Sequence, residues 1–176
     1  HALKHSTTFV DFFSYMIMEL FKDEGLLIID SGDRKLRKLE KDFFKEMILR
    51  TPQITDAVRR QQELLVKDQF HQSIWISDNC SNLFFYDEEN FDRILLEFDL
   101  RENKFVGKNG EVSFSKEELL AIAANEPEKL SNNVVTRPLM QDLLFPTLAF
   151  IAGPGEIAYW AELKKVFELF NIKMPP

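Results

Sequence analysis

Residues 131–176 read SNNVVTRPLMQDLLFPTLAFIAGPGEIAYWAELKKVFELFNIKMPP, and this stretch decides the fold class. Its centre, residues 147–152, is a continuous apolar run that is typical of a buried strand. Gly153, Pro154 and Gly155 follow and predict a sharp turn, after which apolar residues recur at the spacing of a helix. A buried strand that turns sharply into a helix is typical of α/β proteins, and such turns commonly bind ligands.

A second pair of helix and strand is predicted near the start of the chain. Apolar residues recur every three or four positions over residues 9–21, with Ser6 or Thr7 as the expected N-cap of a helix. Residues 26–30 read LLIID and precede a polar turn, which is typical of a buried strand. Together they predict one unit of a parallel sheet.

The middle of the chain changes from helical to strand periodicity. Residues 34–70 are charged and helical in pattern, and Thr51 is the expected cap of the second helix there. Residues 71–114 contain short runs of strand-forming residues, and Asn109 with Gly110 is a strong hairpin signal. We expect a small antiparallel insertion, with strands at residues 73–76, 83–86, 93–98, 104–106 and 112–114.

Ser115 and Glu118 match a capping box, which predicts a helix that ends near Asn125. The fold class we expect is therefore α/β, a partial Rossmann-like core of three layers with a small antiparallel β insertion and flanking helices. The expected divisions are residues 1–70 as the first part of the core, 71–114 as the insertion, and 115–176 as helices plus the strand, loop and helix of a second Rossmann half.

The composition indicates one folded globular domain. Of 176 residues, 45% are hydrophobic and 17 are Phe, so the chain can bury a sizeable core. The net charge of -7 disfavours nucleic-acid binding, and no apolar run approaches the roughly 20 residues of a membrane span. A single cysteine, Cys80, fits a reducing cytoplasm. Neither Cys80 nor His71 has a partner at a metal-ligand spacing, so no metal is expected.

Arg137 is the first candidate for ligand binding. It stands before Pro138 at the expected start of a helix, where a guanidinium can hold a carboxylate or phosphate through two parallel hydrogen bonds. The alternative is a structural salt bridge to Asp142 or Glu156.

Residues 153–158 fit the pattern G-x-G-x-x-A, which is typical of dinucleotide binding after a strand and before a helix. Pro154 removes an amide donor and Glu156 places negative charge where a pyrophosphate needs positive potential. Gly153 and Gly155 therefore favour the approach of a smaller ligand, although nucleotide binding stays an alternative. Glu156 is a candidate for binding an ammonium group or for general-base catalysis, with helix capping as the alternative.

Tyr159 and Trp160 follow one helical turn after Glu156 and are expected on the same side of the helix. Their aromatic faces suit a sugar or an adenine. For Trp160 the alternative is packing in the core against Leu163 and Phe167, because aromatic residues at helical spacing are usually core residues.

Two long strings carry a resemblance to a known family. Residues 134–167 read VVTRPLMQDLLFPTLAFIAGPGEIAYWAELKKVF, with LSNN before them and MPP at positions 174–176. Residues 9–44 read FVDFFSYMIMELFKDEGLLIIDSGDRKLRKLEKDFF. Both resemble the bacillithiol synthase family, the cysteine-adding enzymes of bacillithiol biosynthesis, and the resemblance covers nearly the whole chain.

The resemblance implies a ligase that joins the carboxyl group of L-cysteine to the amine of glucosaminyl malate. It also implies a Rossmann-like core, a coiled coil that pairs two subunits into a homodimer, and a cytoplasmic location. The chain is expected to be an internal fragment that lacks the coiled coil and is inactive alone. A nucleotide is a chemically reasonable activator in the full-length protein, because amide formation from a free carboxylate is uphill.

The resemblance also implies roles for the candidate residues. Arg137 with Asn133 would hold a malyl carboxylate, Glu156 would receive a proton from the attacking amine or bind the cysteine ammonium, and aromatic residues would line the sugar. The expected catalytic residue is Glu156, and the expected substrate-binding residues are Asn133, Arg137, Gln141, Gly153, Gly155, Tyr159 and Trp160. The alternative function is a non-catalytic domain that binds a carboxylate, a sugar or a nucleotide.

Overall fold

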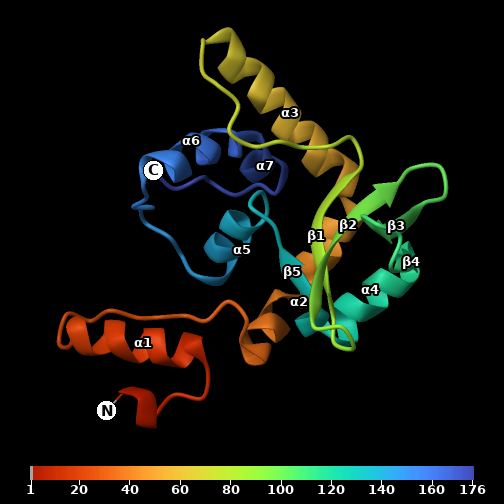
Figure 1. Cartoon of the computed structure of the whole chain (residues 1–176). Coiled ribbons are helices and arrows are strands. Elements are labelled where there is room, and N and C mark those ends of the chain that lie inside the picture. Colours follow the sequence, from red (N-terminus) through yellow and green to blue (C-terminus); the bar gives the residue numbers. More distant parts are fainter. Residues whose placement is uncertain (1) are drawn as a thin grey trace. The chain divides into compact units, whose positions relative to one another are not determined.

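The computed structural model describes residues 2–176, and these divide into two compact units, His1–Arg37 and Lys38–Pro176 (Figure 1). The first unit contains a short 3-10 helix, Ala2–Lys4, and α1, Phe9–Leu20. Thr8 caps α1, so the expected cap at Ser6 or Thr7 is wrong by one or two residues. The Thr8 hydroxyl accepts from the amide of Asp11, and the Asp11 carboxylate accepts from the Thr8 amide. Hydrogen bonds from Thr7 and then Thr8 hold the pKa of Asp11 below its usual value.

The strand expected at residues 26–30 is absent. The segment is extended but forms no sheet pairing, and Leu27 is 76% exposed. The Asp30 carboxylate instead accepts from the amide of Gly32 at 2.7 Å and closes a local turn. A parallel strand needs hydrogen-bonded neighbours, and no strand within residues 2–176 pairs with this segment.

Two consecutive helices follow, α2 (Arg34–Leu49) and α3 (Thr51–Lys67). Thr51 is the first residue of α3 and not its cap, because Arg50 occupies that position. The Thr51 hydroxyl donates backward to the carbonyl of Met47 at 3.0 Å, which joins the end of α2 to the start of α3. Both helices bury one face, as their narrow apolar stripes predict.

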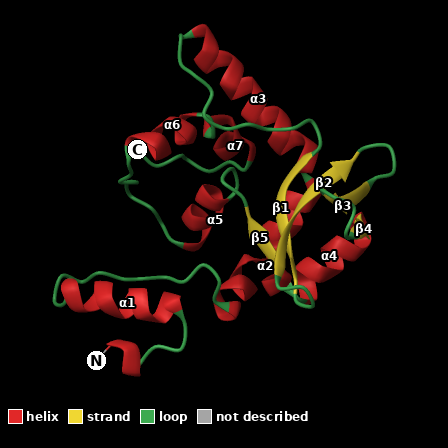
Figure 2. Ribbon diagram, in the orientation of Figure 1, coloured by secondary structure: helices red, strands yellow, loops and turns green. Residues whose placement is uncertain are grey.

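The expected antiparallel region is confirmed as a sheet of five strands with the order β4-β3-β2-β1-β5 (Figure 2). All four pairings are antiparallel. The run at residues 73–76 is not a strand, although Ile74 is buried. Gly110 has a φ of 81° in the turn between β3 and β4, as the Asn-Gly signal predicts. The strands are β1 (Cys80–Asp87), β2 (Asp92–Asp99), β3 (Lys104–Gly107), β4 (Ser113–Ser115) and β5 (Leu130–Asn132).

The capping box at the start of α4 (Lys116–Asn125) is confirmed. The Ser115 hydroxyl accepts from the Glu118 amide at 3.1 Å, and the Glu118 carboxylate accepts from the Ser115 amide at 2.8 Å. Both bonds lower the pKa of Glu118, and the bond from the Ser115 amide has the larger effect. A 3-10 turn, Pro127–Lys129, leads into β5, and three short helices complete the chain: α5 (Arg137–Leu144), α6 (Pro154–Ala161) and α7 (Lys164–Leu169).

The buried strand expected at residues 147–152 is also absent. The segment connects α5 to α6 without sheet pairing, and Leu148 and Ile151 are 91% and 97% exposed. It is tied down at Phe150, whose amide donates to the carbonyl of Pro176 at 2.9 Å and whose ring stacks on Trp160. An apolar run predicts burial only where neighbouring elements cover it, and within residues 2–176 none covers these two side chains.

One hydrophobic core joins the sheet to the helices of the second unit. It includes Phe44 from α2, Leu83 from β1, Phe105 from β3 and Phe167 from α7, all fully buried. In Figure 2, α6 and α7 lie together near α3, and α7 packs against α3. The α/β class is therefore confirmed, with an antiparallel sheet, while the division at residues 70 and 114 stays a prediction.

Candidate functional site

Four of the predicted site residues lie together and form a chain of hydrogen bonds. Arg137 Nη1 donates to Gln141 Oε1 at 3.0 Å, and Arg137 Nη2 donates to Tyr159 Oη at 2.9 Å. Tyr159 Oη donates in turn to Glu156 Oε1 at 3.4 Å. A cation, a phenol and a carboxylate are thus joined across two helices that the sequence separates by nine residues of loop.

Helical spacing explains why these four hydrogen-bonded side chains lie together in pairs. Arg137 is the first residue of α5 and Gln141 lies one turn later, so both side chains share one face of that helix. Glu156 and Tyr159 are three residues apart on α6 and share a face for the same reason. The site is therefore a contact between one face of α5 and one face of α6.

Arg137 is half-buried and its side-chain partners are neutral. Among residues 2–176 it forms no ion pair, so the alternative of a structural salt bridge to Asp142 or Glu156 is not realised. A guanidinium has five N–H donors, and the amide of Gln141 and the phenol of Tyr159 use two of them. The remaining N–H groups can donate to both oxygens of a carboxylate.

Gly153 and Gly155 face open space at the start of α6. A Cβ added to either glycine meets no atom within 4 Å, so neither glycine is required for packing within the described residues. The helix start fits a phosphate poorly, because Pro154 has no N–H and the amides of Glu156 and Ile157 already donate to the carbonyl of Gly153. This geometry supports the approach of a small polar ligand over a pyrophosphate.

Besides the two glycines, two further predicted site residues, Asn133 and Trp160, lie outside these hydrogen bonds. Asn133 is part of a separate polar network, where its Nδ2 donates to Asn82 Oδ1 at 3.0 Å. Trp160 is 4% exposed and stacks on Phe150 with ring centres 3.8 Å apart, which matches the core-packing alternative. Asn133 and Trp160 are close in sequence to Arg137 and Tyr159, and their roles in substrate binding stay predictions.

The structure adds a buried carboxyl group, Glu162, that the sequence did not single out. It is fully buried, and Glu162 Oε2 accepts from Gln62 Nε2 at 2.6 Å. Its other oxygen accepts from the amide of Ser73, and both oxygens lie 3.3 Å from the amide of Ile74. Glu162 therefore holds the segment after α3 against the end of α6. Its position inside an otherwise apolar stretch before Leu163 was the only signal in the sequence.

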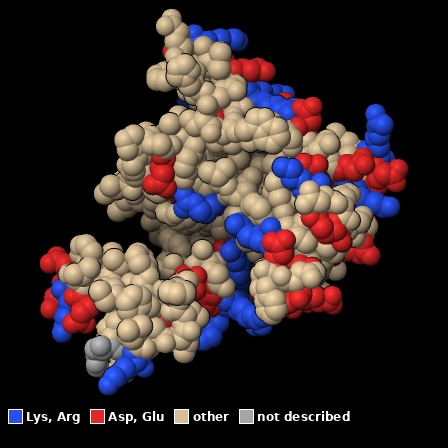
Figure 3. Space-filling model, in the orientation of Figure 1, with Lys and Arg blue, Asp and Glu red and all other residues tan. Residues whose placement is uncertain are grey.

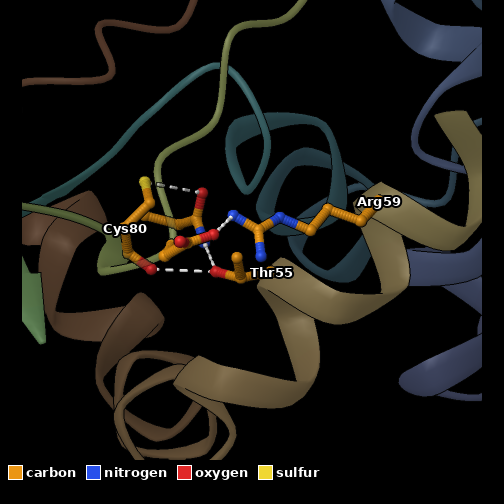
Figure 4. Close-up of polar contacts among 5 residues, drawn as sticks. Thr55, Arg59 and Cys80 are labelled. Carbon is orange, nitrogen blue, oxygen red and sulfur yellow. Dashed lines mark hydrogen bonds and ion pairs between the residues drawn. The ribbon is translucent and has the colours of Figure 1, made fainter. Parts of the chain in front are cut away.

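Cys80 lies beside a polar network between α3 and β1. The carbonyl of Cys80 accepts from Thr55 Oγ1 at 2.9 Å, and its thiol lies 3.4 Å from Asn82 Oδ1 (Figure 4). Arg59, from the next turn of α3, pairs with Asp78 beside it.

Burial is the main cause that raises the pKa of the Cys80 thiol, and Glu97 adds to it. Because the thiolate is the reactive form, we expect iodoacetamide at pH 8 to label Cys80 in the native chain at least about tenfold more slowly than in the urea-unfolded chain. Mass spectrometry over time measures both rates. Equal rates in the two states would contradict this expectation.

The face of the second unit drawn in Figure 3 has an uneven distribution of charged side chains. In Figure 3, charged side chains crowd the surface over the sheet and α4, while the surface over α6 and α7 is mostly uncharged. Among residues 2–176, no group of three His, Cys, Asp or Glu residues is placed to hold a metal ion, and the expected absence of a metal stays a prediction. None of the described helices combines the length and hydropathy of a membrane span.

Relatives of known family match the chain along its whole length. The family model for the N-terminal Rossmann-like domain of the bacillithiol biosynthesis protein BshC matches residues 1–176. Proteins named as cysteine ligase BshC are similar to it: one from Geobacillus sp. (strain WCH70) is 50% identical over 175 residues, and one from Geobacillus thermodenitrificans (strain NG80-2) is 51% identical over 175 residues. A third, from Bacillus cytotoxicus, is 49% identical over 176 residues.

Each match covers 99% of this chain and 32% of the relative, so the chain spans about a third of the length of the curated relatives it matches. The resemblance that the sequence strings indicated is confirmed, and so is the Rossmann-like fold class. The chain belongs to the BshC family of bacillithiol biosynthesis, whose N-terminal Rossmann-like domain it matches from residue 1 to residue 176.

Proposed function

We propose that the full-length protein containing this chain is a cytoplasmic ligase that forms an amide bond between the carboxyl of L-cysteine and the amine of glucosaminyl malate. The family match and the name of the relatives, cysteine ligase, support this reaction class. One observation carries the role of this chain: Arg137 is a half-buried guanidinium whose side chain bonds only to neutral groups among residues 2–176. Such a cation favours an anionic ligand.

In this proposal Arg137 holds a carboxylate of the malyl group. Gln141 and Tyr159 fix the guanidinium from two sides, so that the plane of its free N–H groups is set before the ligand arrives. Pre-ordered donors bind better than free ones, because less side-chain entropy is lost on binding.

Glu156 completes the site as the proton acceptor. It is exposed, and its Oε1 lies 3.4 Å from Tyr159 Oη, so it is joined to Arg137 through a single phenol. Glu156 would contact the nitrogen of a substrate, either by taking a proton from the attacking amine or by binding the cysteine ammonium. Gly153 and Gly155 lie at the start of the same helix, and a Cβ added to either would meet no atom within 4 Å.

A nucleotide that activates the cysteine carboxyl, and a homodimer formed through a coiled coil, belong to the same proposal. Both concern the full-length protein, and the start of α6 offers little to a phosphate. We therefore assign the carboxylate of the acceptor substrate, rather than the nucleotide, to this chain.

The test is Arg137→Ala in the full-length ligase. Loss of a charge-assisted hydrogen-bond pair costs about 1.5 to 3 kcal/mol, so the KM for glucosaminyl malate is expected to rise about 10- to 100-fold with the KM for cysteine unchanged. Arg137→Lys retains the charge without the planar fork and is expected to rescue only part of the loss.

Arg60→Ala is the matched control, because Arg60 is an exposed arginine of α3 that, among residues 2–176, pairs only with Asp56 one turn away. It is expected to leave both KM values unchanged. Calorimetry of this chain with glucosaminyl malate, malate and glucosamine separates binding from ligation. Wild-type kinetics in both Arg137→Ala and Glu156→Gln would remove the support for this site.

A further inference from the structure

Asn82 lies inside strand β1 in a conformation that strands do not use. Its φ is 62°, in the left-handed region that Asn adopts more readily than most residues. The residue is fully buried, and the register of β1 against β2 shifts between Cys80 and Phe84. A buried polar residue at an irregular strand position needs partners for all its polar groups.

The structure provides these partners from two directions. Asn82 Nδ2 lies 3.4 Å from Thr55 Oγ1 on α3, whose bond to the Cys80 carbonyl is drawn in Figure 4. Asn82 Oδ1 accepts from Asn133 Nδ2 at 3.0 Å, and the Asn82 carbonyl accepts from Thr136 Oγ1 at 3.1 Å. Asn82 therefore joins α3 to the segment that leads into α5.

Asn133 and Thr136 form the turn from which α5 begins. Asn133 Oδ1 accepts from the amides of Val135 and Thr136 at 2.9 and 3.2 Å, and its carbonyl accepts from the amide of Arg137 at 3.0 Å. The turn is thus closed by its own side chain and bound to β1 at two points. Arg137, the first residue of α5, is one peptide bond beyond the second of these points.

We propose that Asn82 is a positioning residue for Arg137. Its side-chain oxygen and its carbonyl hold the turn before α5 on strand β1, and this sets where the Arg137 guanidinium meets Gln141 and Tyr159. The proposal rests on the proposed role of Arg137 in carboxylate binding. Asn82 then affects the affinity for glucosaminyl malate, the substrate that Arg137 holds, although Asn82 does not contact this substrate.

The loss of Asn82 is expected to move the guanidinium rather than to remove it. Asn133 Nδ2 loses its acceptor, and of the two side-chain bonds from the turn to residue 82 only the one from Thr136 to the backbone carbonyl remains, beside the pairing of β5 with β1. A displacement of about 1 Å in a binding group is enough to reduce activity by up to about 100-fold. The effect therefore falls on the substrate that Arg137 holds.

The test is steady-state kinetics of the full-length ligase carrying Asn82→Gly, Arg137→Ala or both. Glycine keeps the positive φ without strain, so Asn82→Gly removes the side chain alone. The expected result is a KM for glucosaminyl malate that rises about tenfold, with kcat and the KM for cysteine within about twofold of wild type. In the Arg137→Ala background, Asn82→Gly is expected to change that KM by less than about twofold, because both substitutions act on one contact.

Asn103→Gly is the matched control. Asn103 also has a positive φ, 53°, but it is exposed in the turn between β2 and β3. It is expected to leave all kinetic constants unchanged. Thr136→Val is a second variant, which removes the hydroxyl that donates to the Asn82 carbonyl and that also lies 3.3 Å from Asn133 Oδ1 within the turn. A rise of about threefold in the same KM is expected.

The outcomes separate this proposal from the proposed function. If Arg137→Ala leaves the KM for glucosaminyl malate unchanged, the assignment of Arg137 fails. If Arg137→Ala raises it while Asn82→Gly and Thr136→Val do not, or if the two effects multiply in the double variant, Asn82 does not act through Arg137. Should Asn82→Gly fail to fold, the Thr136→Val result decides.

Discussion

Glu162→Gln is expected to lower the free energy of unfolding of this chain by about 2 to 4 kcal/mol. The carboxyl group is fully buried and accepts from Gln62 Nε2 and from the amides of Ser73 and Ile74. The amide side chain keeps one acceptor oxygen and turns an NH₂ group toward groups that already donate. At least one buried donor is then left without a partner, and such a group costs about 1 to 3 kcal/mol.

Urea unfolding followed by circular dichroism measures the change. Glu168→Gln is the control, because Glu168 is an exposed carboxylate on α7 whose oxygen lies 3.9 Å from Lys165 Nζ. That substitution is expected to stay within about 0.5 kcal/mol of wild type. A Glu162→Gln chain as stable as Glu168→Gln would show that the segment after α3 is held by other contacts.

Phe167→Ala is expected to cost about 3 to 5 kcal/mol, because a fully buried aromatic side chain is replaced by a cavity. Phe167 lies on α7, with its ring centre 5.9 Å from that of Trp160, and α7 packs against α3. The same packing is supported by Arg50, whose guanidinium donates to the carbonyl of Leu169. Loss of the ring removes the aromatic contact between α6 and α7 and leaves a cavity in the core.

Thermal and urea unfolding measure this loss against Phe70→Ala. Phe70 follows α3 and is 62% exposed, so its removal creates no buried cavity and is expected to change stability by less than about 0.5 kcal/mol. Equal effects of the two substitutions would mean that α7 contributes little to the folded state.

Local signals in the sequence were sufficient for the hairpins and for the Ser115 cap of α4, but not for the caps of α1 and α3. β1 to β4 lie in short runs of strand-forming residues separated by turn residues, and the Ser115 capping box depends on four neighbouring residues alone. β5 was missed, because three residues, LSN, carry no periodicity and become a strand only through pairing with β1. An apolar run such as residues 26–30 predicts that the segment is buried in the folded protein, but it does not show which element covers the segment.

The same distinction between local signals and long-range contacts applies to the candidate site. Arg137, Gln141, Glu156 and Tyr159 could be found because helical spacing places each pair on one face, although the meeting of the two helices could not be foreseen. Asn82 and Glu162 were missed for a physical reason. Each is a polar residue whose burial depends on partners far away in the chain, so its importance is visible only in three dimensions.

The stacking of Phe150 on Trp160 gives the chain an internal optical reporter. The chain has two tryptophans, and Trp75 is 84% exposed whereas Trp160 is 4% exposed. Acrylamide therefore quenches the emission of one indole while the other is shielded by the ring of Phe150 and the core. The shielded fraction of the fluorescence reports directly on whether the loop between α5 and α6 stays docked, without a label or a substitution.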